Sequence, residues 1–160
     1  WGAFLLLDES LHQDKRWHKR IQVAVGLGLT PLITLIAGAS NRLSLSKRLQ
    51  LPGKQQNLLQ ELDELEKVFT DIYTSHEYKK WNPSDWCNVI EERNWHLDTI
   101  ALAIALEIPL WKSLLRWLKN WRLVESPISA RVLIEQGLQP GPSLRAELKR
   151  LRKKKLDENN

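Results

Sequence analysis

Residues 128–145 read ISARVLIEQGLQPGPSLR, and this stretch predicts a short helix, a tight turn and a second helix. Ser129 is a residue type that caps helix N-termini, and Gly137 stands where a helix C-terminus favours a positive φ. Gly141 leaves the backbone without a side chain, and Pro142 suits the first position of the next helix. The unpaired amides at such a helix start favour a phosphate, so the stretch indicates nucleic-acid binding.

The segment after this turn is the most basic in the chain. Seven cations and a single acid, Glu147, lie between Ser143 and Lys155, so this segment carries +6 while the whole chain carries +5. Leucines at positions 144, 148 and 151 predict a helix with one buried stripe and outward cations. The alternative is a solvated lysine-rich end. The predicted RNA contacts in this tail are Arg131, Gly141, Ser143, Arg145, Lys149, Arg152 and Lys153.

Two further basic patches lie upstream. One falls between residues 41 and 54, where no acid is present, and the other is a stripe at positions 112, 116 and 119. Each patch alone is more often a solvated face than a binding surface. If both faced the same side as the C-terminal helix, they would follow a polyphosphate backbone. From the first patch we include Arg42, Lys47 and Arg48 among the predicted RNA contacts.

Apolar residues recur every three or four positions through most of the chain, and no window alternates with period two. We therefore expect an all-α fold, an irregular multi-helix array with a helix-turn-helix-like tail. We divide the chain into a helical region, residues 1–125, and a tail, residues 126–160. The expected helices before the tail are Trp1–Leu7, Asp14–Leu27, Pro31–Ala39, Ser44–Leu51, a long helix opened by Pro52, Trp86–Glu92, Trp95–Glu107, and one from Pro109 to near Trp121.

Catalytic chemistry has no recognisable motif in this chain. The sequence lacks a glycine-rich phosphate loop with its lysine, a nucleophile elbow and a metal-binding histidine pair. Four histidines and the single Cys87 show no ligand spacing, so we expect no metal site and no catalytic residue on this segment. Eight tryptophans are present, and those at helical spacing favour core packing over base stacking.

Cysteine content and hydropathy bear on the compartment. One cysteine forms no internal disulfide, which is typical of a reducing compartment and favours the cytoplasm. The mean hydropathy of −0.39 is typical of a soluble protein. The apolar stretch 23–39 is interrupted by Gly26 and Pro31, so we expect two short buried helices there and no membrane span. The chain contains no methionine and begins at Trp1, and we expect a fragment of a longer protein.

Residues 129–144, SARVLIEQGLQPGPSL, resemble the tail motif of bacterial tRNA nucleotidyltransferases. These are the CCA-adding, CC-adding and A-adding enzymes of the poly(A) polymerase superfamily. Residues 43–51, LSLSKRLQL, followed by a leucine-rich helix, are similar to the body region of those enzymes. The resemblance spans roughly residues 30–156 and is specific at the tail motif. The turn matches, and the departures from the family's usual residues are Ala130 and Arg145 in place of Gly and Val132 in place of an acid.

The resemblance implies that residues 1–125 are a neck- and body-like region, that residues 126–160 are the tail, and that body and tail grip tRNA. In that family a separate N-terminal head carries the metal-binding carboxylates and uses Mg²⁺ with CTP or ATP, and a neck selects the nucleotide. The implied partners are the acceptor and TψC arm of tRNA and a catalytic head of the same parent chain. The implied role is cytoplasmic tRNA processing at the 3′ end.

Two other functions are left open by the sequence. A helix-hairpin-helix DNA-binding module also holds phosphates at a glycine-containing turn, although the sequence contains no second hairpin copy. A helical protein-interaction domain, with a basic tail that only solubilises it, is the other alternative.

Overall fold

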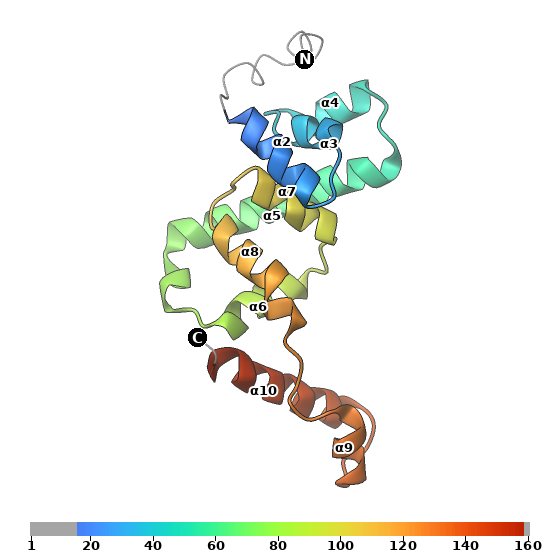
Figure 1. Ribbon diagram of the computed structural model, residues 1–160, viewed down its shortest axis with the longest axis vertical. Helices are drawn as coiled ribbons and strands as arrows, with labels where there is room; N and C mark the ends of the chain where they lie inside the picture. Colours follow the sequence, from blue (N-terminus) through green and yellow to red (C-terminus); the bar gives the residue numbers. More distant parts are fainter. Residues whose placement is uncertain (1–15, 159–160) are drawn as a thin grey trace. The chain divides into compact units, whose positions relative to one another are not determined.

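The computed structural model describes residues 16–158, and within this range the chain forms helices and no strand (Figure 1). The all-α prediction is confirmed. The helix expected at residues 1–7 lies outside the described residues. In chain order the described α-helices are α2 (Trp17–Gly26), α3 (Pro31–Ala37), α4 (Arg42–Arg48), α5 (Gly53–Ser75), α6 (Pro83–Glu92), α7 (Leu97–Ala105), α8 (Trp111–Lys119), α9 (Ala130–Glu135) and α10 (Pro142–Glu158), with 3₁₀ helices η2 (Glu77–Lys80) and η3 (Trp121–Leu123).

The chain divides into two compact units, each built from two separate segments. Among the described residues, the first unit holds residues 16–76 together with Trp95–Lys112, and the second holds Glu77–Asn94 together with residues 113–158. The boundary that we placed at residue 125 lies inside the second unit. The tail therefore shares its unit with α6, η3 and most of α8.

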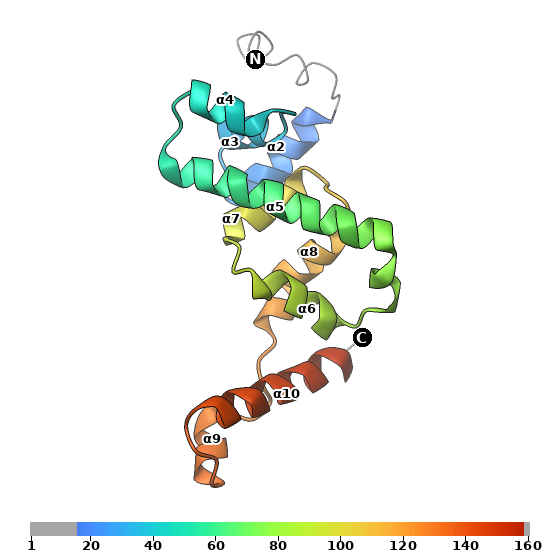
Figure 2. The ribbon, with the colours of Figure 1, turned by 180° about the vertical axis from the view of Figure 1, so that it is seen from behind.

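The core of the first unit is built on α5 and α7. Figure 2 shows α5 lying across α7, and the two helices are in contact along with the pairs α4–α5, α2–α3 and α2–α7. Residues 99–105 of α7 are all buried, as its continuous apolar sequence predicts. The side chains that α5 buries follow helical spacing and are Leu58, Leu59, Leu62, Leu65 and Phe69.

The apolar stretch 23–39 is split between two helices, as its sequence predicts. Pro31 is the first residue of α3, and Thr30 Oγ1 accepts the N–H of Ile33 at 3.5 Å to cap it. We expected both helices to be buried, but α2 is only partly so, since its Val25 side chain is 52% exposed. None of the described helices has both the length and the apolar character that crossing a membrane requires.

The start of α7 is capped by a carboxylate from α5. Glu61 Oε2 accepts the backbone N–H of His96 at 3.1 Å and the hydroxyl of Thr99 at 2.6 Å. Nδ1 of His96 lies 2.7 Å from Oε1 of the same carboxylate. Burial alone would raise the pKa of Glu61, but these hydrogen bonds outweigh it and lower the pKa below the ordinary 4.5. This contact ties the two core helices of the first unit together.

Replacing Glu61 tests how far this cap stabilises the first unit. We expect Glu61→Ala to lower the free energy of unfolding by about 1–3 kcal/mol, because donors at the start of α7 lose a charged acceptor. The contribution is complete above the ordinary carboxyl pKa of 4.5 and is lost as the pH falls through the lower folded-state value. Urea unfolding of the wild type and of Glu61→Ala at about pH 7 and about pH 3 measures both effects. We expect a smaller difference in the free energy of unfolding at the lower pH.

The control is Gln60→Ala, at the exposed neighbouring position of α5. An equal loss of stability in both variants would contradict the role assigned to Glu61.

Candidate nucleic-acid interface

The turn between α9 and α10 has the conformation that its sequence predicts. Ser129 Oγ accepts the N–H of Val132 at 3.4 Å and caps α9. Gly137 has a φ of +102° and Gly141 a φ of +141°, a region that residues with side chains rarely adopt. Pro142 is the first residue of α10. The predicted order of elements, a helix, a glycine turn and a second helix, is therefore confirmed.

The start of α10 presents backbone donors beside this turn. The N–H of Arg145 donates to the carbonyl oxygen of Gly141 at 3.1 Å, which begins the hydrogen-bond ladder of the helix. The N–H groups of Ser143 and Leu144 precede that bond, and α-helix geometry gives them no acceptor inside the helix. Ser143 is exposed, so this end of α10 meets solvent. Free amides and the helix dipole together favour an anion at this end.

α10 buries one side against its neighbours α6 and α9. Leu144 and Leu156 are buried, while Leu148 and Leu151 are only half-buried. The predicted leucine stripe therefore lies on the buried side of the helix, but it is fully buried along only part of its length. A polar contact completes the buried side.

That polar contact is made by Arg152, which we expected to face outward and contact RNA. Its guanidinium instead binds both carboxylate oxygens of Glu91 on α6, at 2.7 and 2.8 Å. It also donates to the carbonyl oxygens of Val124 at 2.7 Å and Trp121 at 3.3 Å. The outward orientation predicted for Arg152 is wrong, because a carboxylate from a distant part of the chain meets it on the buried side.

Glu91 is the centre of this network. Besides Arg152, it accepts the indole N–H of Trp117 on α8 at 3.0 Å. Burial alone would raise the pKa of Glu91, but the hydrogen bonds from Arg152 and Trp117 outweigh it and lower the pKa. The hydrogen bond to Glu91 likewise raises the pKa of Arg152. Both groups are therefore charged across the physiological range.

A second contact fastens the far end of α10 to the start of α6. The Asp157 carboxylate accepts the backbone N–H of Ser84 at 3.0 Å and its hydroxyl at 2.9 Å. α6 has its own capping box, in which the N–H of Asn82 donates to Asp85 at 2.9 Å. Because Ser84 meets residue 157 and Glu91 meets residue 152, the two helices run antiparallel.

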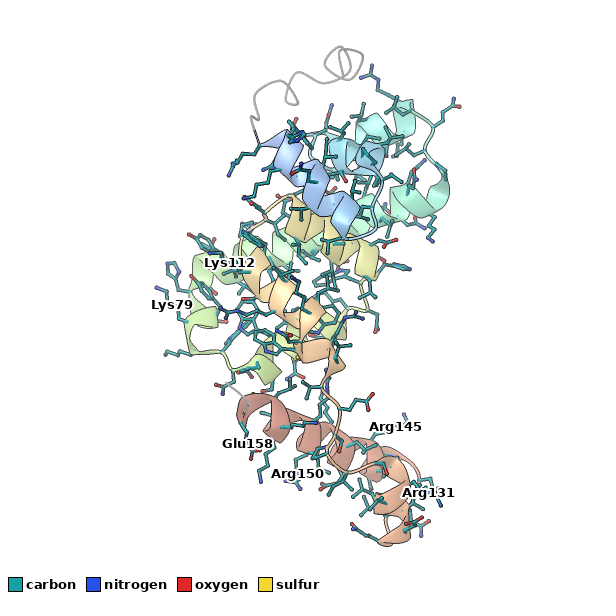
Figure 3. The ribbon with its side chains drawn as sticks, viewed as in Figure 1. Lys79, Lys112, Arg131, Arg145, Arg150 and Glu158 are labelled. Carbon is teal, nitrogen blue, oxygen red and sulfur yellow. The ribbon has the colours of Figure 1, made fainter. Side chains whose placement is uncertain are left out.

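The exposed cations of the tail fall into two groups. Some pair with acids on their own helix: Arg131 with Glu135 at 3.1 Å, Arg150 with Glu147 at 2.6 Å and Lys154 with Glu158 at 3.7 Å. Figure 3 shows Arg145 and Arg150 on different sides of α10. The second group has no acid within 4 Å among the described residues, lies at four-residue spacing along one side of α10, and comprises Arg145, Lys149 and Lys153.

The three upstream residues that we predicted to contact RNA lie in the first unit. Arg42 bridges Asp63 at 3.1 Å and Glu66 at 2.8 Å, and its side chain is only 13% exposed. It therefore joins α4 to α5. Lys47 and Arg48 are exposed in the last turn of α4. The seven remaining predicted residues belong to the second unit, so the structure places the predicted contacts in two separate groups.

A groove between α6 and α10 brings two of the predicted residues opposite α6 residues that were not predicted to contact RNA. Asn88 and Cys87 of α6 line it, opposite Lys149 and Lys153 of α10. Asn88 carried no signal, because a single exposed asparagine on a helix is ordinary. Across residues 16–158, no three His, Cys, Asp or Glu side chains come together in the manner of a metal site.

Comparison with known proteins adds no relative to this description. No family model, no curated protein and no solved structure matches the chain. The candidate site therefore consists of the turn at Gly141, the start of α10 and the row of three exposed cations.

The Glu91–Arg152 pair generates a test of how the tail is held. We expect Glu91→Gln to lower the free energy of unfolding by about 2 kcal/mol, because it leaves the half-buried guanidinium without its counter-charge. The effect is complete above the ordinary carboxyl pKa of 4.5 and disappears as the pH falls through the lowered value. Urea unfolding, monitored by circular dichroism at several pH values, measures the loss of stability and its pH dependence.

Glu92→Gln is the matched control, since the Glu92 side chain is 73% exposed and its carboxylate lies 3.9 Å from Arg93. If the Glu92 variant loses as much stability as the Glu91 variant, the stabilising role assigned to the Glu91–Arg152 pair is refuted.

Proposed function

We propose that this chain binds tRNA through its tail, the role that the resemblance to tRNA nucleotidyltransferases implies. The observation that carries the proposal is the open start of α10, followed on one side of the helix by Arg145, Lys149 and Lys153. Two glycines with positive φ hold the turn that leaves this helix start uncovered. Backbone amides and cations together are the groups that bind phosphates.

The spacing of these groups suits a sugar-phosphate backbone. From residue 145 to residue 153 the row is about 12 Å long at 1.5 Å per residue. A duplex carries several phosphate charges over such a length. The major groove of A-form RNA is too narrow for side chains, so contacts of this kind hold the duplex by its shape and charge rather than by its sequence. The proposed binding is therefore largely independent of sequence.

The proposal extends to the parent protein. A catalytic head outside the described residues, using Mg²⁺ with CTP or ATP, would add 3′-terminal nucleotides in the cytoplasm. The tail, by holding the acceptor and TψC arm at a fixed distance from the 3′ end, would present that end in register. Whether C, A or both are added is decided by the head and neck and not by the tail.

Salt dependence is the direct test of phosphate contacts. We expect tRNA binding to weaken as salt rises from about 50 to about 200 mM, and Lys149→Ala to reduce the slope of log K against log salt by about 0.7–0.9. Filter binding measures both proteins. Lys154→Ala is the control, because Lys154 pairs with Glu158 at 3.7 Å, and its slope should change less. Binding that ignores salt, or is absent at the lowest salt, would refute the proposal.

The turn is tested separately from the charge. Gly141→Ala forces a side chain into a φ of +141°, which strains the turn by about 1–3 kcal/mol. We expect weaker tRNA binding with an unchanged salt slope, because no charge is removed. Gly53→Ala, where a Cβ meets nothing within 4 Å and φ is ordinary, should bind as the wild type does. Equal affinity in all three proteins would exclude the turn from the interface.

The two alternative functions predict different results in the same assay. A DNA-binding module would release tRNA to duplex DNA as readily as to unlabelled tRNA. A protein-interaction domain would keep any nucleic-acid binding unchanged after Lys149→Glu and Lys153→Glu. Arg152 is left out of such a test because its substitution would loosen α10 itself.

A further inference from the structure

The groove between α6 and α10 is a preformed cavity of the second unit. It encloses about 460 Å³, within the range of sites for small organic ligands and far more than a phosphate ion fills. Two contacts hold its walls, one between Ser84 and Asp157 near one end and one between Glu91 and Arg152 beside it. Because both walls are fixed by charged hydrogen bonds, the groove exists without a ligand.

Around this groove, two lysine charges are not balanced by a nearby acid. The carboxylate of Glu91 is matched by Arg152, whose donors are taken up by it and by main-chain oxygens. Glu92 also lines the groove, where its side chain is 73% exposed and lies 3.9 Å from Arg93. Lys149 and Lys153 line the groove and have no acid within 4 Å among the described residues. An anionic group is therefore favoured along the α10 wall.

Two lining residues of the groove, which we call its floor, are buried and uncharged. Leu156 is 4% exposed and Cys87 is 2% exposed. Burial, aided by the nearby charge of Glu91, raises the pKa of the Cys87 thiol to about 12, so the thiol is neutral at physiological pH. Asn88 stands exposed on the α6 wall, where its amide offers both donors and an acceptor. A flat, partly apolar group with polar edges suits this wall and floor.

These features combine in one ligand class. We propose that the groove takes a single nucleotide unit, with its phosphate on Lys149 and Lys153, its base over Cys87 and Leu156, and its base edge facing Asn88. The inference rests on the proposed function, because the expected source of that unit is an unpaired nucleotide of the bound RNA. Proteins that recognise RNA beyond its duplex shape do so mainly at unpaired bases. A free nucleotide has the same chemistry and is the other source to be tested.

The test fills the groove without changing its charge. Asn88→Trp places an indole on the α6 wall, and Asn120→Trp places one at an exposed site of the same unit that does not line the groove. Affinities are measured for tRNA, for a blunt RNA duplex without loops, and for AMP and CMP. We expect Asn88→Trp to weaken tRNA binding about tenfold, the order of one lost base contact. Its salt slope and its duplex binding should stay unchanged, and Asn120→Trp should match the wild type.

Asn88→Asp is a second variant that adds a negative charge instead of bulk. It should weaken tRNA binding as well, while its thermal unfolding stays close to that of the wild type. If Asn88→Trp weakens AMP or CMP binding and leaves tRNA binding intact, the groove serves free nucleotides. If neither variant changes binding of any of these ligands, the inference is overturned. Absence of tRNA binding by the wild type would refute the proposed function alone, because the mononucleotide measurements still test the groove.

Discussion

Arg152, in the most basic helix of the chain, turns toward a carboxylate, and Glu91 of α6 supplies that carboxylate. The same guanidinium also binds main-chain oxygens of residues 121 and 124, so a single side chain joins α6, α10 and the segment after α8. The pair also sets which cations are free. With Arg152 turned inward, three exposed cations of α10 that have no acid within 4 Å among the described residues, Arg145, Lys149 and Lys153, stand four residues apart on one side. The RNA proposal needs this arrangement.

Both units use a carboxylate from one helix to complete the start of another. Glu61 of α5 meets the first residues of α7 in the first unit. Asp157 of α10 meets Ser84 at the start of α6 in the second. Each contact places a negative charge at the positive end of a helix dipole while satisfying amides that lack a partner inside their helix. Helix packing in this chain is therefore specified by charged contacts as well as by leucines.

The parts of the structure that depend only on residues close by in the sequence were predictable from it. The cap at Ser129 and the turn at Gly137 and Gly141 are decided within five or six positions, and their signals are local. Arg42 and Arg152 were assigned to RNA because helical spacing gives no sign of a carboxylate that arrives from another helix. For the same reason the sequence did not reveal the groove, or that each unit draws on two segments of chain.

The interleaving of the two units has a consequence for synthesis. The chain leaves the first unit after His76 and returns to it at Trp95, so α6 emerges from the ribosome between two parts of another unit. Residues of α8 and η3 reach α6 earlier, but Ser84 on its buried face has no partner until Asp157 of α10 has been made. Both segments of the first unit are synthesised before the last segment of the second unit is complete. Translation thus completes the first unit before the second, and a ribosome stalled before α10 would expose to chaperones the part of α6 that α10 later covers.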